Sequence, residues 1–183
     1  SDPVLEAAIQ MQMPLVRGNV DINGNTVYIS DYAPDTTPES IYEKVVSTAY
    51  DGKVVLMHGT SSQTAEILDN ICATLYADGY RFVTVSELFE YKLKVTDPTQ
   101  IDISKSYSED RYINANLPRA IYRTSDVVLK YYNEDQWFLH PEDYKLIAFT
   151  FDDGPSSDVT LTQKYVYELA KYGGKATLFL VGQ

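Results

Sequence analysis

The feature that most restricts how this chain folds is the alternation of short apolar runs with helical patterns. Residues 62–80 and 158–174 carry apolar side chains at helical spacing, and Gly79 and Gly173 are placed to end these two helices. Between and around them lie runs of consecutive apolar residues, which are typical of strands buried on both faces. These runs are KVVLMH (53–58), RFVTV (81–85), LIAFTF (146–151) and KATLFLV (175–181). The order predicts an α/β fold with a parallel sheet or barrel.

The first fifty residues carry further local signals. Residues 4–12 (VLEAAIQMQ) predict a short helix, and residues 14–20 (PLVRGNV) predict a strand. An Asn-Gly pair at 23–24 between alternating residues predicts a hairpin. Thr37 is a candidate N-cap and Pro38 suits the first helical position, so a helix is expected to follow them.

Charge and cysteine content exclude several classes of function. The chain has 26 acidic and 15 basic residues, a net charge of −11, and this disfavours binding to nucleic acid and to anionic membranes. Cys72 is the only cysteine, so neither an intrachain disulfide nor a cysteine-based metal cluster is possible. No apolar stretch is long enough to span a membrane. A polar, tyrosine-rich stretch, residues 91–144, interrupts the α/β pattern and is interpreted as a connecting or accessory segment.

Ionisable side chains follow three of the expected strands. Asp152 and Asp153 come directly after LIAFTF, His58 ends KVVLMH, and Asp21 follows PLVRGNV. In parallel α/β folds the carboxyl ends of the strands share one edge, where ligands bind. These three strands are therefore expected to bring their ionisable residues to the same edge.

Two adjacent carboxylates suggest a division of labour. They do not both ionise easily in a dry cleft unless a cation compensates them. A divalent metal bound by one carboxylate would leave the other as a base for water, and His58 as a proton donor to a leaving group. This is metal-assisted hydrolysis of an amide or ester. Asp-Asp-Gly-Pro is equally acceptable as turn chemistry, and the residues alone leave both readings open.

The motifs themselves resemble a known family. TFDDGP (150–155) followed by KATLFLVGQ (175–183) resembles the first motif and the next strand of the polysaccharide deacetylases, the NodB-homology enzymes of carbohydrate esterase family four. DGKVVLMHGT (51–60) and the helix and strand that follow it, ending in VSEL (85–88), resemble the close of the same domain, with its leucine-histidine motif.

The resemblance implies a distorted (β/α) barrel. Residues 1–90 would form its C-terminal half and residues 145–183 its N-terminal part, with 91–144 between them. It also implies removal of acetyl groups from N-acetylglucosamine polymers such as peptidoglycan or chitin, or from acetylated xylan, in the cell envelope or outside the cell. A signal peptide is not among these residues.

The family's site residues can be carried over by position. The resemblance implies that Asp152 is the general base, that Asp153 is a ligand of zinc or a related divalent ion, and that His58 is the general acid. Leu56 matches the leucine that lines the acetyl pocket. Asp21 is placed like the aspartate that tunes the catalytic histidine, although the hairpin signal gives it a competing structural role.

Two departures separate this sequence from the family pattern. The motif order is rotated, with the closing half first, and the central block with its His-x-x-x-His pair of metal ligands is missing. His140, the only other histidine, lies before the first-motif strand and is expected to be a surface or packing residue. Catalytic zinc usually has three protein ligands, so tight zinc binding by this chain alone is not expected.

Three explanations of the missing block remain open. A second chain or another copy supplies it, or the sequence joins the end of one deacetylase domain to the start of another. The third is that the protein has lost the metal and acts as a non-catalytic carbohydrate-binding relative.

Overall fold

Helices and strands alternate along the chain, as the apolar pattern predicts. The computed structural model describes residues 3–11, 16, 18–93 and 141–181. The elements within these ranges are α1 (Pro3–Met11), α2 (Pro38–Ser47), β1 (Lys53–His58), α3 (Ser62–Ala77), β2 (Tyr80–Val83), α4 (Val85–Leu88), the π-helical turn η1 (Phe89–Leu93), the 3-10 turn η4 (Pro141–Asp143), β3 (Lys145–Gly154), α7 (Val159–Ala170) and β4 (Ala176–Leu180).

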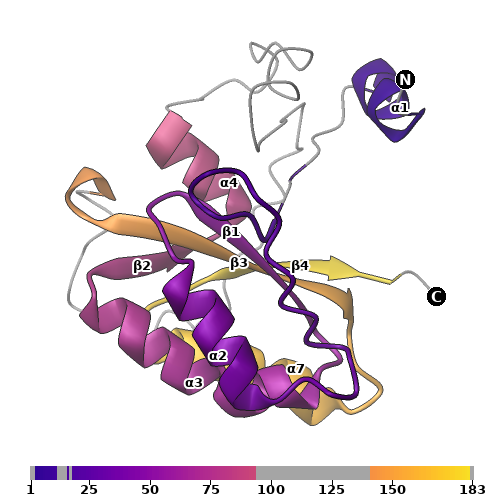
Figure 1. The fold of residues 1–183 in the computed structure, drawn as a ribbon, viewed down its shortest axis with the longest axis vertical. Coiled ribbons are helices and arrows are strands. Elements are labelled where there is room, and N and C mark those ends of the chain that lie inside the picture. The colour runs from indigo at the N-terminus through magenta and orange to yellow at the C-terminus, as the bar shows by residue number, and fades with distance from the viewer. Residues whose placement is uncertain (1–2, 12–15, 17, 94–140, 182–183) are drawn as a thin grey trace.

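The four strands form one sheet with β3 at its centre (Figure 1). β1 runs parallel to β3 along one side, from Lys53 opposite Ile147 to His58 opposite Asp152. The other side of β3 is shared: β2 pairs with its first half and β4 with its second, both in parallel. The predicted parallel α/β architecture is confirmed, and segments 1–90 and 145–183 contribute to the same sheet. Closure into a barrel and a rotated motif order stay predictions, and most of segment 91–144 lies outside the described residues.

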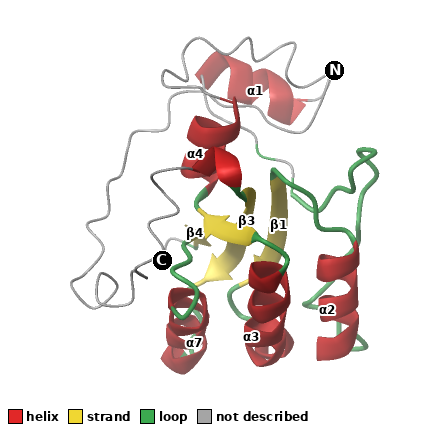
Figure 2. Cartoon of the chain, turned by 90° about the vertical axis from the view of Figure 1, so that its left-hand side faces the viewer, coloured by secondary structure: helices red, strands yellow, loops and turns green. Residues whose placement is uncertain are grey.

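Helices cover the two faces of the sheet unequally. α2, α3 and α7 lie side by side against one face, while α4 lies on the other (Figure 2). Successive strand residues point to opposite faces. Accordingly, Met57 and Phe149 belong to the core under the three helices, whereas Val54 and Ala148 belong to the core shared with α4 and η1. Burial on both faces explains why β1 and β3 are continuously apolar in sequence.

Local side-chain bonds fix where the helices begin. The Thr37 hydroxyl accepts a hydrogen bond from the Ser40 amide, and the Ser40 hydroxyl accepts one from the Thr37 amide, so α2 begins with a reciprocal capping box. The predicted helix start at Thr37 and Pro38 is confirmed. Gly79 adopts a φ of +86° just after α3, a conformation that favours glycine.

The predicted hairpin at the Asn23-Gly24 pair is confirmed, and it is short. A turn forms there, but within the described residues its two arms share a single antiparallel bridge, between Val20 and Thr26. Asn19 has a φ of +54°, which interrupts an extended strand before the turn. The turn is instead stabilised by the Asp21 carboxylate, which accepts hydrogen bonds from the amide of Asn23 and from the amide and side chain of Asn25.

Lys53 is a buried amine at the start of β1. Its side chain is 0% exposed, and its Nζ donates a hydrogen bond to the backbone oxygen of Thr48 at 2.9 Å. Burial lowers the pKa of Lys53 to about 8, because removal from water disfavours the ammonium form.

We expect this lysine to make stability depend on pH. Below about pH 8 the ammonium is charged in both folded and unfolded chains, so the full desolvation penalty opposes folding; the penalty disappears as pH rises toward 10. Urea denaturation of the wild type and of Lys53→Met should show that Lys53 contributes a rise of about 2 kcal/mol in the free energy of unfolding over this interval. Lys53→Met should abolish most of that rise. An equal rise in the variant would contradict the assignment.

Candidate functional site

His58 and Asp152 lie side by side at one edge of the sheet. They are register partners at the ends of the parallel strands β1 and β3. The Gly59 amide donates a hydrogen bond to the Asp152 backbone oxygen at 2.7 Å, so the pairing continues one residue past β1. An imidazole and a carboxylate that are 94 positions apart in the chain are thereby held as neighbours.

A buried carboxylate is hydrogen-bonded to both the ring and the backbone amide of His58. Asp31 is 1% exposed, and its Oδ1 lies 2.8 Å from Nδ1 of His58. Its Oδ2 accepts hydrogen bonds from the His58 amide at 2.8 Å and from the Thr64 hydroxyl at 2.7 Å. Bonding at Nδ1 leaves Nε2 as the ring nitrogen available for a substrate, and a carboxylate at Nδ1 stabilises the imidazolium.

The loop between β1 and α3 is hydrogen-bonded to Asp31 and to α7. The Ser61 hydroxyl donates to the Asp31 backbone oxygen at 2.9 Å and also caps the start of α3. From α7, the Tyr165 hydroxyl donates to the backbone oxygens of Ser61 and His58. Tyr165 is itself stacked on Phe151, with ring centroids 4.7 Å apart. His58 therefore sits on a backbone fixed from two sides.

Asp152 is suited to accept a proton. Burial is the main cause of a raised pKa for Asp152; the neighbouring carboxylates of Asp153 and Asp31 add to the rise, and His58 opposes it. Its Oδ1 is buried and has no hydrogen-bond partner among the described residues. A buried carboxylate oxygen without a partner is costly unless a ligand uses it, which marks Asp152 as a candidate functional group.

Asp153 is set apart from Asp152 by a bulge. The pairing of β3 with β4 shifts register between Asp152 and Gly154, which leaves Asp153 as the extra residue. Its φ is +63°, a left-handed conformation that Asp adopts more readily than most residues. The side chain is exposed, so its carboxylate is available to a cation or a substrate.

Asp21 lies elsewhere. Its carboxylate is occupied by Asn23 and Asn25, and hydrogen bonds from Asn25 are the main cause of its lowered pKa. It acts electrostatically on Lys53, at the opposite end of β1 from His58. The structure thus brings Asp31, not Asp21, to the histidine. The sequence does hold a signal for Asp31, because it follows a stretch of mixed polar and apolar residues with strand-forming side chains, NTVYIS.

Two apolar side chains adjoin His58. Leu56 lies two residues earlier in β1, hence on the same face of the sheet, and is half-buried. The Tyr32 ring meets the His58 ring edge-on, with centroids 5.1 Å apart, and remains 70% exposed. Leu56 and the Tyr32 ring are therefore the apolar groups nearest to hand for an acyl group or a sugar ring at His58.

The metal donors in the described part of the chain do not complete a site. No group of three or more His, Cys, Asp or Glu side chains there is arranged to hold a metal ion. His140 lies outside the described residues. Because the whole sequence has two histidines, 82 positions apart, a second copy of this chain would not bring a His-x-x-x-His pair either.

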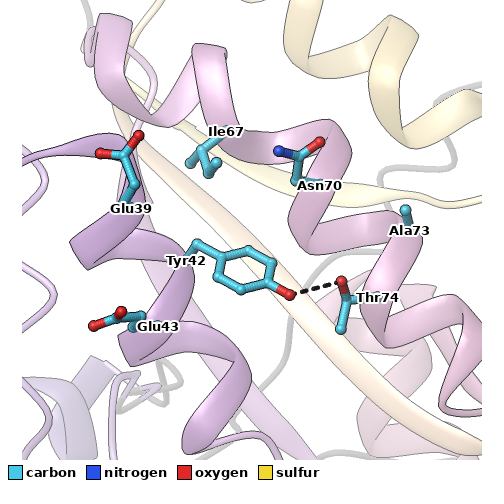
Figure 3. A pocket seen from close by; sticks show the side chains of 7 residues that line it. All are labelled: Glu39, Tyr42, Glu43, Ile67, Asn70, Ala73 and Thr74. Carbon is cyan, nitrogen blue, oxygen red and sulfur yellow. Dashed lines mark hydrogen bonds between the residues drawn. The ribbon is translucent and has the colours of Figure 1, made fainter.

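A separate groove lies between α2 and α3, lined by Glu39, Tyr42, Glu43, Ile67, Asn70, Ala73 and Thr74 (Figure 3). The hydroxyls of Tyr42 and Thr74 are hydrogen-bonded at 2.9 Å across it. None of its residues belongs to the group around His58, so the candidate site stays at the edge of the sheet. Nor does any helix in the described ranges have the length and apolarity to cross a bilayer.

Comparison with known proteins points to one family. Residues 140–183 match the polysaccharide deacetylase family. The chain is 34% identical over 84 residues to a bifunctional xylanase/deacetylase of Pseudobutyrivibrio xylanivorans, which is 45% of this chain and 13% of that protein.

Two further relatives have related names. Identity is 42% over 55 residues with the peptidoglycan-N-acetylglucosamine deacetylase PgdA of Listeria monocytogenes (30% of this chain, 12% of that protein). It is 49% over 57 residues with a peptidoglycan-N-acetylglucosamine deacetylase of Bacillus cereus (30% and 27%). The matched segments thus span 12–27% of these relatives. No solved structure matches the chain.

Proposed function

We propose that this chain supplies the acid–base half of a site that removes acetyl groups from a polysaccharide, because residues 140–183 match the polysaccharide deacetylase family and the relatives bear deacetylase names. The pairing of His58 with Asp152 carries the proposal. The proposed proton donor, His58, and the proposed proton acceptor, Asp152, lie on adjacent strands, and Asp31 is bonded to Nδ1 of the imidazole.

The proposed substrate is the N-acetylglucosamine of peptidoglycan, in the cell envelope or outside the cell. The names of the Listeria and Bacillus relatives support this choice. Chitin contains the same acetylated sugar and is the second candidate. Acetylated xylan is the third candidate, because one relative is named a bifunctional xylanase/deacetylase.

The chain's own residues can divide the proton transfers. Asp152 takes a proton from the water that attacks the acetyl carbon, and its raised pKa makes it a better base. A carbon–oxygen bond forms and the carbon–nitrogen bond breaks. His58 gives a proton to the departing amine, while Asp31 stabilises the charged ring. The products are acetate and a free amino sugar.

A divalent cation, with zinc the first candidate, is part of the proposal. Such an ion would polarise the acetyl carbonyl and lower the pKa of water. Asp153 is the proposed ligand from this chain, because its carboxylate is exposed beside Asp152. The remaining ligands are proposed to come from a different sequence. Exposed apolar side chains on β4, where further structure could pack, support this: Leu178, Phe179 and Leu180 are 41–60% exposed.

Asp153→Asn is the sharpest test of the metal proposal. Asn tolerates the left-handed conformation at this position as Asp does, so the fold should persist while the ligand charge is lost. In the protein that also contains the missing ligands, we expect zinc affinity to fall at least tenfold, with deacetylation of N-acetylglucosamine oligomers falling in parallel. Metal analysis, zinc titration and acetate release measure these effects.

The same measurements separate an enzyme from a non-catalytic module. One divalent ion per wild-type site, together with acetate release, supports the enzyme. A metal-free protein that still binds glycan would favour the carbohydrate-binding alternative. Undiminished zinc affinity in Asp153→Asn would remove Asp153 from the ligand set.

A further inference from the structure

Within the described ranges, the outer edge of β1 is bonded by side chains and not by another of the named strands. Asn19 forms two hydrogen bonds to one residue of that edge: its Nδ2 donates to the Leu56 backbone oxygen at 2.7 Å, and its Oδ1 accepts from the Leu56 amide at 2.9 Å. Two positions further along, the His58 amide donates to Asp31. The Leu56 backbone is therefore bonded by the Asn19 side-chain amide, and the His58 backbone by the Asp31 carboxylate.

The backbone of Asn19 is arranged to make this clamp possible. Its amide donates to the Val54 oxygen at 2.9 Å, and its own oxygen accepts from the Val27 amide at 2.7 Å. The left-handed φ of +54° is one that Asn adopts readily. Backbone and side chain together thus hold β1 at two successive outward-facing positions, Val54 and Leu56.

Gly18 completes the contact with Leu56. A Cβ at position 18 would lie 2.9 Å from Leu56 Cβ, closer than side chains tolerate. The Gly18-Asn19 pair therefore touches the side chain of Leu56 and also bonds both of its backbone groups. The backbone of Leu56 is thus bonded through both its amide and its oxygen, and Gly18 lies close to its side chain.

We infer that Asn19 is a positioning residue that sets the size of the acyl group accepted beside His58, an inference that rests on the proposed deacetylase function. Leu56 and His58 share a face of β1, so the half-buried Leu56 side chain forms apolar surface next to the imidazole. A fixed wall admits an acetyl methyl group and excludes one more methylene. Without the clamp, Leu56 can retreat and the discrimination weakens.

Two substitutions at Asn19 separate the parts of the clamp. Asn19→Gly keeps the left-handed backbone and removes both side-chain bonds. Asn19→Asp keeps an acceptor for the Leu56 amide but places an oxygen against the Leu56 oxygen. Asn25→Ala is the matched control, because it loosens the neighbouring turn through Asp21 without touching β1.

The experiment compares kcat/KM for N-acetyl and N-propionyl glucosamine oligomers, using the protein with its complete metal site. We expect the wild type and Asn25→Ala to prefer acetyl by about tenfold or more. Both Asn19 variants should reduce that preference at least threefold. Amide hydrogen exchange at Leu56 should speed up in Asn19→Gly and stay slow in Asn19→Asp.

Failure of the inference can be told from failure of the proposed function. If both substrates lose activity equally in the Asn19 variants, or if exchange at Leu56 is unchanged in Asn19→Gly, the positioning role is overturned. The deacetylase proposal would still stand in that case. If the wild type releases no acetate while exchange changes as expected, the clamp exists but the size-selection role falls together with the proposed function.

Discussion

His58→Ala is expected to lower deacetylation by about 10²–10⁴-fold, the usual contribution of a general acid or base. The physical reason is that His58, the register partner of Asp152, is the group proposed to protonate the departing amine. Alanine keeps the strand and removes only the ring that meets Asp31 and Tyr32. The measurement is acetate release in the protein with its complete metal site.

Two controls make this result specific. Metal content should be unchanged, because the proposed ligand of this chain is Asp153 and not His58. Added imidazole should restore part of the activity by entering the vacated space. Loss of the metal in His58→Ala would move the histidine from the acid role to the ligand set, and undiminished activity would remove it from the mechanism.

Asp31→Asn should reduce the rate by a similar factor, about 10²–10⁴-fold, although Asp31 touches no substrate. One side of the Asn amide can still accept from the His58 amide and the Thr64 hydroxyl, as Oδ2 does now. The NH2 group would then face Nδ1, where it opposes the doubly protonated ring that a general acid requires. The steady-state rate should fall mainly through kcat, because substrate contacts remain.

Thr64→Val is the matched control for Asp31. It removes one hydrogen bond to Oδ2 and leaves both contacts between Asp31 and His58 intact. A loss of about tenfold or less is expected there, consistent with one buried hydrogen bond. If Asp31→Asn were no worse than Thr64→Val, the carboxylate would be structural rather than a positioning group for His58.

The strands and the ends that carry His58 and Asp152 could be predicted from the sequence because both signals are local. Runs that are apolar at every position require burial on both faces, and parallel strands end at one edge. The carboxylate partner of His58 could not be assigned this way. Asp21 and Asp31 both follow stretches that contain strand-forming residues, and only the fold shows that the Asp21 carboxylate is hydrogen-bonded to Asn23 and Asn25.

The different surroundings of the two adjacent carboxylates could not be predicted from the sequence either. In a regular strand, Asp152 and Asp153 would point to opposite faces of the sheet. The sequence contains no pattern that predicts the register shift after Asp152. The bulge gives them different surroundings: Asp152 is half-buried with a raised pKa, and Asp153 is exposed. The clamp from Asn19 to Leu56 was equally hidden, because it joins residues 37 positions apart through a side chain.

The hydrogen bonds along the outer edge of β1 affect how this protein can aggregate. An edge strand normally has unpaired amide and carbonyl groups that can pair with a strand of another molecule. Amyloid fibrils grow by such pairing. Here Asn19 and Asp31 already engage the groups of Leu56 and His58 that such pairing would use. Fibril growth is therefore expected to begin at some other border of the sheet and not along this edge of β1.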